Sequence, residues 1–199
     1  MQSLSLLLRT GYMASMGWFH SLEKGRAVKR QLEPIPWITY SAIAFLENRV
    51  SPTHRVFEFG AGMSTLWWAS RCHSVHSVEH DHAWVAQLQS LLPTNAKVKH
   101  QDLEYAGQYC RSATAQATPF DIILVDGRDR VNCAIFSINA LSDKGVIVWD
   151  DTNRQRYQTG LRYLEAKGFK RIDFEGLKPC VLEGSVTSVF YRDNNCFNL

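Results

Sequence analysis

The stretch Val56-Phe57-Glu58-Phe59-Gly60-Ala61-Gly62-Met63-Ser64-Thr65 runs from an apolar strand through two glycines into the start of a helix. Because glycine has no Cβ, the backbone at Gly60 and Gly62 can turn tightly and let a ligand lie against it. The amides that open the following helix then face that ligand, and Ser64 or Thr65 would be the N-cap. The stretch predicts a ligand site at the end of a strand, although a purely structural turn has the same pattern.

Short apolar runs and helical stretches alternate along the chain from this motif onward. The apolar runs are strand candidates at residues 55–59, 74–79, 97–100, 120–125 and 146–149, and the helical stretches cover residues 64–71, 82–92, 131–141 and 155–167. This alternation predicts an α/β fold in which helices cover both faces of a parallel sheet. After Gly168, residues 169–175 and 185–192 follow as two strand-like runs with no helix between them, which predicts an antiparallel hairpin closing a seven-stranded sheet.

The composition is that of a soluble globular protein. The chain has 199 residues, of which 45% are hydrophobic and 21% charged, and this excludes disordered, collagen-like and coiled-coil classes. Its length corresponds to one domain of ordinary size. The 22 Lys and Arg against 19 Asp and Glu give a net charge of +3, which is too small to indicate a nucleic acid or an acidic membrane as partner.

The cysteines and the first residues bear on the cellular compartment. The five cysteines are odd in number and form no CxxC pair, which argues against a disulfide framework or a zinc knuckle and favours the reducing cytoplasm. The apolar run at residues 6–8 has no basic region before it, so no signal peptide is expected. No run reaches the roughly 18 apolar residues of a membrane span.

The residues before the motif form a candidate N-terminal extension. We expect residues 1–54 to be a helical extension and lid-like lead-in, followed by the ligand-binding domain at residues 55–199. Residues 4–22 fit an amphipathic helix or helix pair whose apolar side carries Tyr12, Met13, Met16, Trp18 and Phe19. That side would pack on the main domain or on a second subunit in a homodimer, and a membrane-surface or lid role is the alternative.

An acidic residue in the second strand narrows the ligand class. Glu79 comes nineteen residues after Gly60, where a carboxylate can accept hydrogen bonds from both ribose hydroxyls of a nucleoside. A dinucleotide or S-adenosylmethionine fits this geometry. Thr65 replaces the third glycine of a dinucleotide motif, and Asp102 follows the third strand where it could meet an adenine amino group. These features favour the methyl donor over a nicotinamide cofactor.

Taken together, these motifs resemble the class I S-adenosylmethionine-dependent methyltransferases over residues 56–192. The matching pieces are EFGAGMST, SVEHD, HQDLEY, DIILVDG and GVIVWDD. The resemblance implies a three-layer Rossmann-like fold with strand order 3-2-1-4-5-7-6, strand 7 antiparallel, and a donor site at the carboxyl ends of strands 1 to 4. It also implies a methyltransferase activity of class EC 2.1.1.

Carried over residue by residue, the resemblance assigns most of a donor site. Glu58, Gly60 and Gly62 would line the amino-acid end of S-adenosylmethionine, next to Ser64 and Thr65. Glu79 would hold the ribose, and His80 would border the ribose or the adenine. Asp102 and Leu103 would contact the adenine, and Asp126 would stand near the methyl group. Structural alternatives are a cap for neighbouring amides at Glu58 and a turn-forming role at Asp102.

Three carboxylates follow the fourth and fifth strands. Asp126, Asp150 and Asp151 would converge at one edge of the sheet if these strands are neighbours, and oxygen ligands of this kind suit Mg²⁺. The pattern resembles the metal-dependent catechol and macrocin O-methyltransferases, but the lysine base of the catechol kind is absent. In the alternative, Arg128, Arg130 or Arg154 neutralises the cluster without a metal. Asp126 or Asp150 is the candidate base.

The function that these observations favour is methyl transfer to an oxygen or nitrogen of a small-molecule or sugar-like acceptor, with S-adenosylmethionine as cofactor and Mg²⁺ as a second candidate. A nicotinamide-dependent oxidoreductase and a non-catalytic binding protein of the same fold are the alternatives. The near-neutral charge disfavours nucleic acid as the acceptor. A zinc site from the histidines at 73, 76, 80 and 82 is disfavoured, because His73 and His76 point to opposite faces of a strand.

Overall fold

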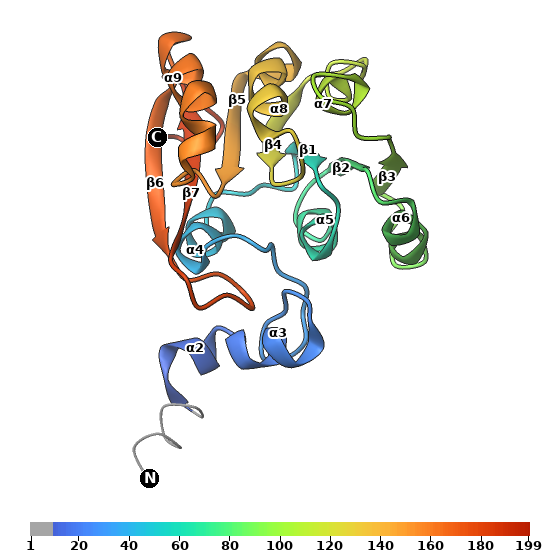
Figure 1. The fold of residues 1–199 in the computed structure, drawn as a ribbon, viewed down its shortest axis with the longest axis vertical. Coiled ribbons are helices and arrows are strands. Elements are labelled where there is room, and N and C mark those ends of the chain that lie inside the picture. Colours follow the sequence, from blue (N-terminus) through green and yellow to red (C-terminus); the bar gives the residue numbers. More distant parts are fainter. Residues whose placement is uncertain (1–9) are drawn as a thin grey trace.

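The computed structural model describes residues 10–199, which form a seven-stranded sheet between two layers of helices (Figure 1). The strands are β1 (Arg55–Phe59), β2 (Ser74–Glu79), β3 (Ala96–His100), β4 (Phe120–Val125), β5 (Leu141–Asp150), β6 (Lys170–Gly176) and β7 (Ser185–Tyr191). Their order is β3-β2-β1-β4-β5-β7-β6. Strands β1 to β5 are parallel, and β7 is antiparallel to both β5 and β6. The expected sheet order and closing hairpin are therefore confirmed.

Alternate side chains of the central strands fill two separate cores, one on each face of the sheet. On one face, Val56 packs with residues of α4 (Tyr40–Glu47) and α5 (Met63–Ala69). On the other face, Phe57 packs with residues of α7 (Gln108–Arg111), α8 (Arg130–Ser137) and α9 (Gln158–Ala166). A further helix, α6 (His82–Gln89), covers the β2 and β3 end. Burial on both faces explains why these strands are continuous apolar runs.

Some element bounds differ from the sequence-based expectation. The helix expected at residues 131–141 ends at Ser137, and a 3₁₀ turn at Ile138–Ala140 leads into β5, which begins at Leu141. Helix α5 begins at Met63, so its N-cap is Gly62, not Ser64 or Thr65. The hydroxyl of Thr65 accepts a hydrogen bond from the Gly62 amide at 3.1 Å and thereby caps this end from inside the first turn.

The N-terminal segment packs on the main domain. It contains α2 (Tyr12–Ser15) and α3 (Trp18–Lys24), a pair of short helices that separates at Gly17, while the part of the expected helix at residues 4–9 lies outside the described residues. Trp18 is buried in the same core as α4 and α5, and its Nε1 donates to the carbonyl of Val181 at 3.1 Å. Tyr12 is 62% exposed, so its assignment to the apolar side was wrong. Within residues 10–199, every helix is too short or too polar to cross a membrane.

Candidate functional site

The loop after β1 packs directly against the turn after β4. Gly60 has a φ of +88°, and a Cβ there would lie 2.8 Å from the Cα of Gly127 and 2.9 Å from its nitrogen. No other residue fits this position without moving one of the two turns. The carboxyl ends of β1 and β4 are thereby held together, and Figure 1 shows that β4 and β5 both point toward the N-terminal segment. The candidate site lies at this edge.

Glu58 supports the loop from beneath instead of lining the site. Its side chain is fully buried, and its Oε2 accepts hydrogen bonds from the hydroxyls of Thr65 at 2.5 Å and Ser77 at 2.8 Å. Burial raises the pKa of Glu58 from an ordinary value of 4.5 to about 7, against the lowering effect of these hydroxyls. The structure thus places Glu58 and Thr65 behind the glycine loop, and the partners of Glu58 are hydroxyls, not the neighbouring amides that the structural alternative named.

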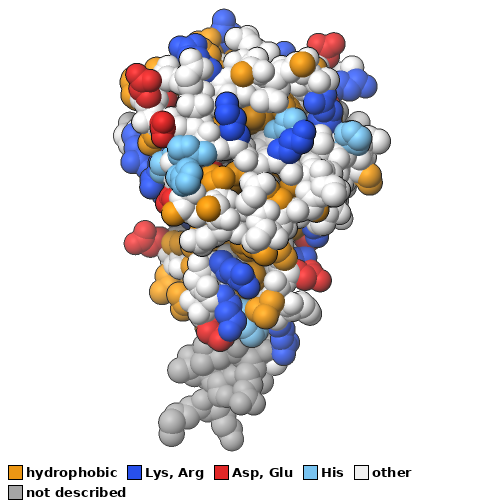
Figure 2. Space-filling model, turned by 90° about the vertical axis from the view of Figure 1, so that its right-hand side faces the viewer, with side chains coloured by type: hydrophobic (Ala, Val, Ile, Leu, Met, Phe, Trp, Pro, Cys, Tyr) orange, Lys and Arg blue, Asp and Glu red, His pale blue; other side chains and the backbone are white. Residues whose placement is uncertain are grey.

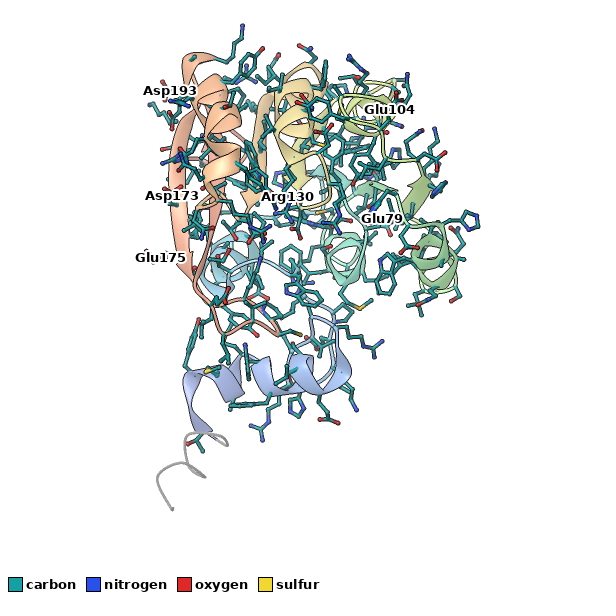
Figure 3. All side chains as sticks on the ribbon, viewed as in Figure 1. Glu79, Glu104, Arg130, Asp173, Glu175 and Asp193 are labelled. Atoms are coloured by element: carbon teal, nitrogen blue, oxygen red, sulfur yellow. The ribbon has the colours of Figure 1, made fainter. Side chains whose placement is uncertain are left out.

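Glu79 joins the end of β2 to the glycine loop. Its Oε2 accepts from the amide of Ala61 at 3.1 Å, and its Oε1 accepts from the amides of His80 at 2.7 Å and Asp81 at 2.9 Å. The Nδ1 of His80 lies 2.5 Å from the same Oε1. Glu79 and His80 both face a cavity, and Figure 3 shows Glu79 and Arg130 at the same edge of the sheet.

The cavity at this edge has a volume of about 410 Å³. The predicted residues Gly60, Gly62, Ser64, Glu79, His80 and Asp126 line it, together with residues that sequence reasoning missed: Gly25, Arg26, Ala27, Trp37, Ala61, Met63, Trp84, Gly127, Arg128 and Arg130. A Cβ at Gly62 would meet nothing nearer than the Ser64 hydroxyl at 4.0 Å, so a side chain there would project into open space. The absence of a side chain at Gly62 leaves that space to a ligand.

Two residues of the lead-in and one of α6 enclose the cavity. Trp84 donates from its Nε1 to the carbonyl of Ala61 at 2.8 Å, which fixes an indole against the glycine loop. Arg26 and the 40% exposed Trp37 line the cavity from the N-terminal side. Residues before the main domain therefore complete the site, although no sequence motif marks them.

Asp102 and Leu103 do not line this cavity, so their expected adenine contacts are not supported. The side chain of Asp102 is 93% exposed, and its Oδ1 lies 3.6 Å from the Nε2 of His100. Leu103 is 45% exposed. The chain turns outward after β3, and both side chains follow it into solvent.

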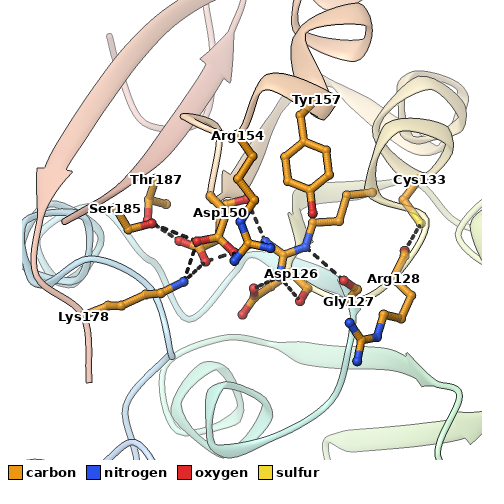
Figure 4. A network of polar contacts seen from close by, with 12 residues as sticks. Asp126, Gly127, Arg128, Cys133, Asp150, Arg154, Tyr157, Lys178, Ser185 and Thr187 are labelled. Carbon is orange, nitrogen blue, oxygen red and sulfur yellow. Dashed lines mark hydrogen bonds and ion pairs between the residues drawn. The ribbon is translucent and has the colours of Figure 1, made fainter. Parts of the chain in front are cut away.

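The acidic residues after β5 are held by cations of the protein (Figure 4). Asp150 is fully buried, and its carboxylate accepts from the Lys178 ammonium at 2.9 Å and from the Thr187 hydroxyl at 2.7 Å. Asp151 accepts from Lys178 at 2.6 Å, and its other oxygen lies 2.6 Å from Arg154. Burial alone would raise the pKa of Asp151, but Lys178, Arg130 and Ser185 together outweigh it and hold this pKa below its ordinary value.

This arrangement does not fit a magnesium site. The Lys178 ammonium lies between Asp150 and Asp151 where a cation would have to bind, and Arg130 lies 3.2 Å from the second oxygen of Asp151. The three expected carboxylate ligands thus face three protein cations. In the described part of the chain, no group of three or more His, Cys, Asp and Glu residues could hold a metal ion. The expected ligand set of Asp126, Asp150 and Asp151 is not supported.

Asp126 is the acidic residue of this network that faces the cavity. Its Oδ1 lies 2.9 Å from the Nη2 of Arg130, and its side chain is 18% exposed, against 0% for Asp150. Burial raises the pKa of Asp126 well above its usual range, and Arg130 opposes that rise. The structure thereby separates the two candidate bases: Asp126 reaches the cavity, whereas Asp150 is enclosed and engaged on both oxygens.

A family model described as a methyltransferase domain matches residues 57–152. A comparison with curated protein sequences finds no match. The solved structures that share the fold include the following three. Precorrin-6y C5,15-methyltransferase from Geobacter metallireducens is 12% identical with a TM-score of 0.61, and the alignment covers 86% of this chain and 96% of that one.

The other two structures are equally distant in sequence. An rRNA methylase from Streptococcus thermophilus is 11% identical with a TM-score of 0.57, over 79% of this chain and 100% of that one. A candidate methyltransferase from Streptococcus mutans, solved in complex with S-adenosylhomocysteine (SAH), is 9% identical with a TM-score of 0.54. The alignment covers 74% of this chain and 94% of that one. Identities this low establish the likeness of fold alone.

Proposed function

We propose that this chain, whose fold is that of the class I S-adenosylmethionine-dependent methyltransferases, transfers a methyl group from S-adenosylmethionine to an oxygen or nitrogen of a small-molecule acceptor. The observation that carries the proposal is the cavity at the carboxyl ends of β1, β2 and β4. There a glycine loop without side-chain obstruction, a carboxylate at the end of β2 and a cavity-facing aspartate meet.

The residues that line the cavity fit the methyl donor. The loop at Gly60 and Gly62 lets a ligand lie against the backbone, and Glu79 and His80 stand where a ribose would be held. Trp84 and Trp37 add aromatic walls for the adenine in place of Asp102 and Leu103. When bound, S-adenosylmethionine supplies an activated methyl group on a good leaving group, so the protein has mainly to align the acceptor and accept a proton.

Asp126 is the proposed base. As the methyl carbon's bond to sulfur breaks and its bond to the acceptor oxygen or nitrogen forms, the acceptor loses one proton, which the carboxylate of Asp126 takes up, and SAH leaves. The raised pKa of Asp126 favours this role because a base is most effective when its pKa is close to the working pH. Arg130 holds the Oδ1 of Asp126 in place at 2.9 Å.

The test is a methyl-transfer assay that follows SAH release with a panel of hydroxylated and amine acceptors. We expect Asp126→Asn to lower kcat by about 10²–10⁴-fold while the affinity for SAH stays unchanged. The wild-type rate should rise with pH as Asp126 loses its proton. Turnover of every acceptor at the wild-type rate in the variant would remove Asp126 from the chemistry, and absence of SAH binding would reject the proposed function itself.

The alternatives are weaker on specific grounds. A nicotinamide-dependent oxidoreductase is disfavoured by Thr65, which takes the place of the third glycine and caps α5 from the inside. In a non-catalytic binding protein of this fold, Asp126 would serve only as the ion-pair partner of Arg130, and the assay above separates the two cases. Nucleic acid is the alternative acceptor, since a structural neighbour is an rRNA methylase.

Three further predictions rest on the sequence. The first is a boundary near residue 54 between the N-terminal extension and the ligand-binding domain. The second is the formation of a homodimer through the N-terminal segment, and the third is a cytoplasmic location. The shared core around Trp18 indicates that residues from 10 onward pack on the main domain.

A further inference from the structure

A second cavity adjoins the proposed donor site. It has a volume of about 460 Å³ and shares Gly127, Arg128 and Arg130 with the first cavity. Arg154 and Arg156 lie in its other wall, so four of its lining residues are arginines. A cavity that adjoins the one lined by Asp126, and that is itself lined by four arginines, is suited to bind the second substrate of the proposed reaction.

Two of these arginines already have acidic partners. Arg130 lies 2.9 Å from Asp126, and Arg154 lies 2.6 Å from Asp151. These two guanidinium groups are used to balance the buried carboxylates. They shape the wall of the cavity but supply little free positive charge.

The other two arginines are available for a ligand. Among residues 10–199, no carboxylate lies within ion-pair distance of Arg128 or Arg156. Arg156 lies over the ring of Tyr157 and donates to its hydroxyl at 3.1 Å, which orients the guanidinium without neutralising it. The acidic lining residue, Asp129, accepts from the amide of Ala106 at 2.9 Å and from the Asn132 side chain at 2.8 Å.

We propose that this second cavity is the acceptor site and that it takes a small molecule carrying a phosphate or carboxylate group. The inference rests on the proposed function and adds the charge class of the acceptor. Arginine forks form paired hydrogen bonds with such groups. The start of α8 at Arg130 also points its partial positive charge toward this cavity. An anion held by Arg128 and Arg156 would leave the rest of the acceptor beside Asp126.

The distribution of charge favours a small molecule over a nucleic acid. Arg128 and Arg156 are both exposed, and they line one cavity together with the acidic Asp129. On the face drawn in Figure 2, basic and acidic side chains are scattered and form no basic stripe. The net charge of +3 gives little long-range attraction for a polyanion.

The test is calorimetric titration of inorganic pyrophosphate and of citrate into the SAH-saturated protein and into the free protein. We expect Arg128→Gln and Arg156→Gln each to weaken binding of these anions by about tenfold, since each removes charge-assisted hydrogen bonds. Arg162→Gln is the matched control, because Arg162 is exposed on α9 outside this cavity and its loss changes the net charge equally. The affinity for SAH should be the same in the wild type, Arg156→Gln and Arg162→Gln, because neither of these arginines lines the donor cavity.

The outcomes separate this inference from the proposed function. The anion site would be overturned by anion binding that is weakened equally in Arg162→Gln, or that is not weakened in Arg128→Gln and Arg156→Gln. In both cases, binding of SAH would still support a methyltransferase. Failure of SAH to bind would overturn the acceptor role together with the proposed function. A short single-stranded RNA that binds more tightly than pyrophosphate, and loses affinity in both variants, would replace the small-molecule acceptor by a nucleic acid. In matched pairs of acceptors, we expect the phosphorylated member to be the better substrate, with its KM raised in Arg128→Gln.

Discussion

The ammonium nitrogen of Lys178 lies 2.6 Å from Oδ1 of Asp151 and joins the segment between β6 and β7 to the carboxyl end of β5. Asp151 adopts a left-handed backbone conformation with a φ of +61°, which turns its carboxylate back toward the sheet. Lys178 also reaches Asp150 at 2.9 Å. One buried lysine therefore contacts two of the three carboxylates that the sequence suggested as metal ligands.

The removal of this lysine should be strongly destabilising. We expect Lys178→Met to lower the free energy of unfolding by about 3–5 kcal/mol, because the substitution removes the nearest cation of the fully buried Asp150. Urea denaturation at neutral pH measures the change. Lys144→Met is the control, since Lys144 is an exposed lysine of β5. A loss of equal size in both variants would show that Lys178 has no special role in the cluster.

Because of the same cluster, we expect divalent cations to have no effect on the stability or the activity of the protein. Lys178, Arg130 and Arg154 already form ion pairs with the carboxylates. Neither EDTA nor millimolar Mg²⁺ should therefore change the melting temperature or the rate of methyl transfer. Thermal scans and the SAH-release assay with both additives measure this. A rise in melting temperature that saturates with Mg²⁺ would restore the metal hypothesis.

The carboxylate at the end of β2 should be important for donor binding. We expect Glu79→Ala to weaken SAH binding by about 1–3 kcal/mol, because a charged hydrogen-bond acceptor is lost. Glu79 also accepts from the amides of Ala61, His80 and Asp81, so the variant loosens the loop as well. Glu104→Ala, on the exposed segment after β3, is the control for the charge change. Calorimetry that finds unaltered affinity in Glu79→Ala would take Glu79 out of the site.

The buried Glu58 should make stability depend on pH. Its folded-state pKa of about 7 lies above the ordinary value of 4.5, so the folded protein keeps a proton that the unfolded chain has already lost between these values. The free energy of unfolding should therefore fall by about 3 kcal/mol as the pH rises through this window. In Glu58→Gln this contribution is absent, and the profile from pH 4.5 to 7 should be flatter. Parallel profiles for the two proteins would contradict the raised pKa.

The sheet was predictable because its signals are local. Apolar runs, helical periodicity and a missing helix after Gly168 are each contained within a few residues, and together they fix which strands are parallel. The glycine loop was predictable for the same reason. Gly60 and Gly62 directly follow a buried strand, and Glu79 ends the next one.

The parts of the site that were missed depend on how distant segments meet. Arg26 and Trp37 reach the cavity only because the lead-in folds over the end of the sheet. Lys178 lies in a connection whose sequence has no periodic pattern, 27 residues from Asp151. Asp102 lies outside the cavity lining because a strand end predicts where the backbone stops, while the loop beyond it decides where the side chain points.

The measurement that tests the central claim most directly is calorimetric titration of SAH and of NAD into the wild-type protein, Gly62→Val and Gly184→Val. We expect SAH to bind to the wild type and NAD not to bind. We also expect Gly62→Val to stay folded and to lose at least about tenfold in SAH affinity, because a side chain there enters the space of the ligand. Gly184→Val is the control, since a Cβ at Gly184 meets no atom within 4 Å and Gly184 lies outside the cavity. Binding of NAD but not of SAH, or SAH binding that Gly62→Val leaves intact, would contradict the account.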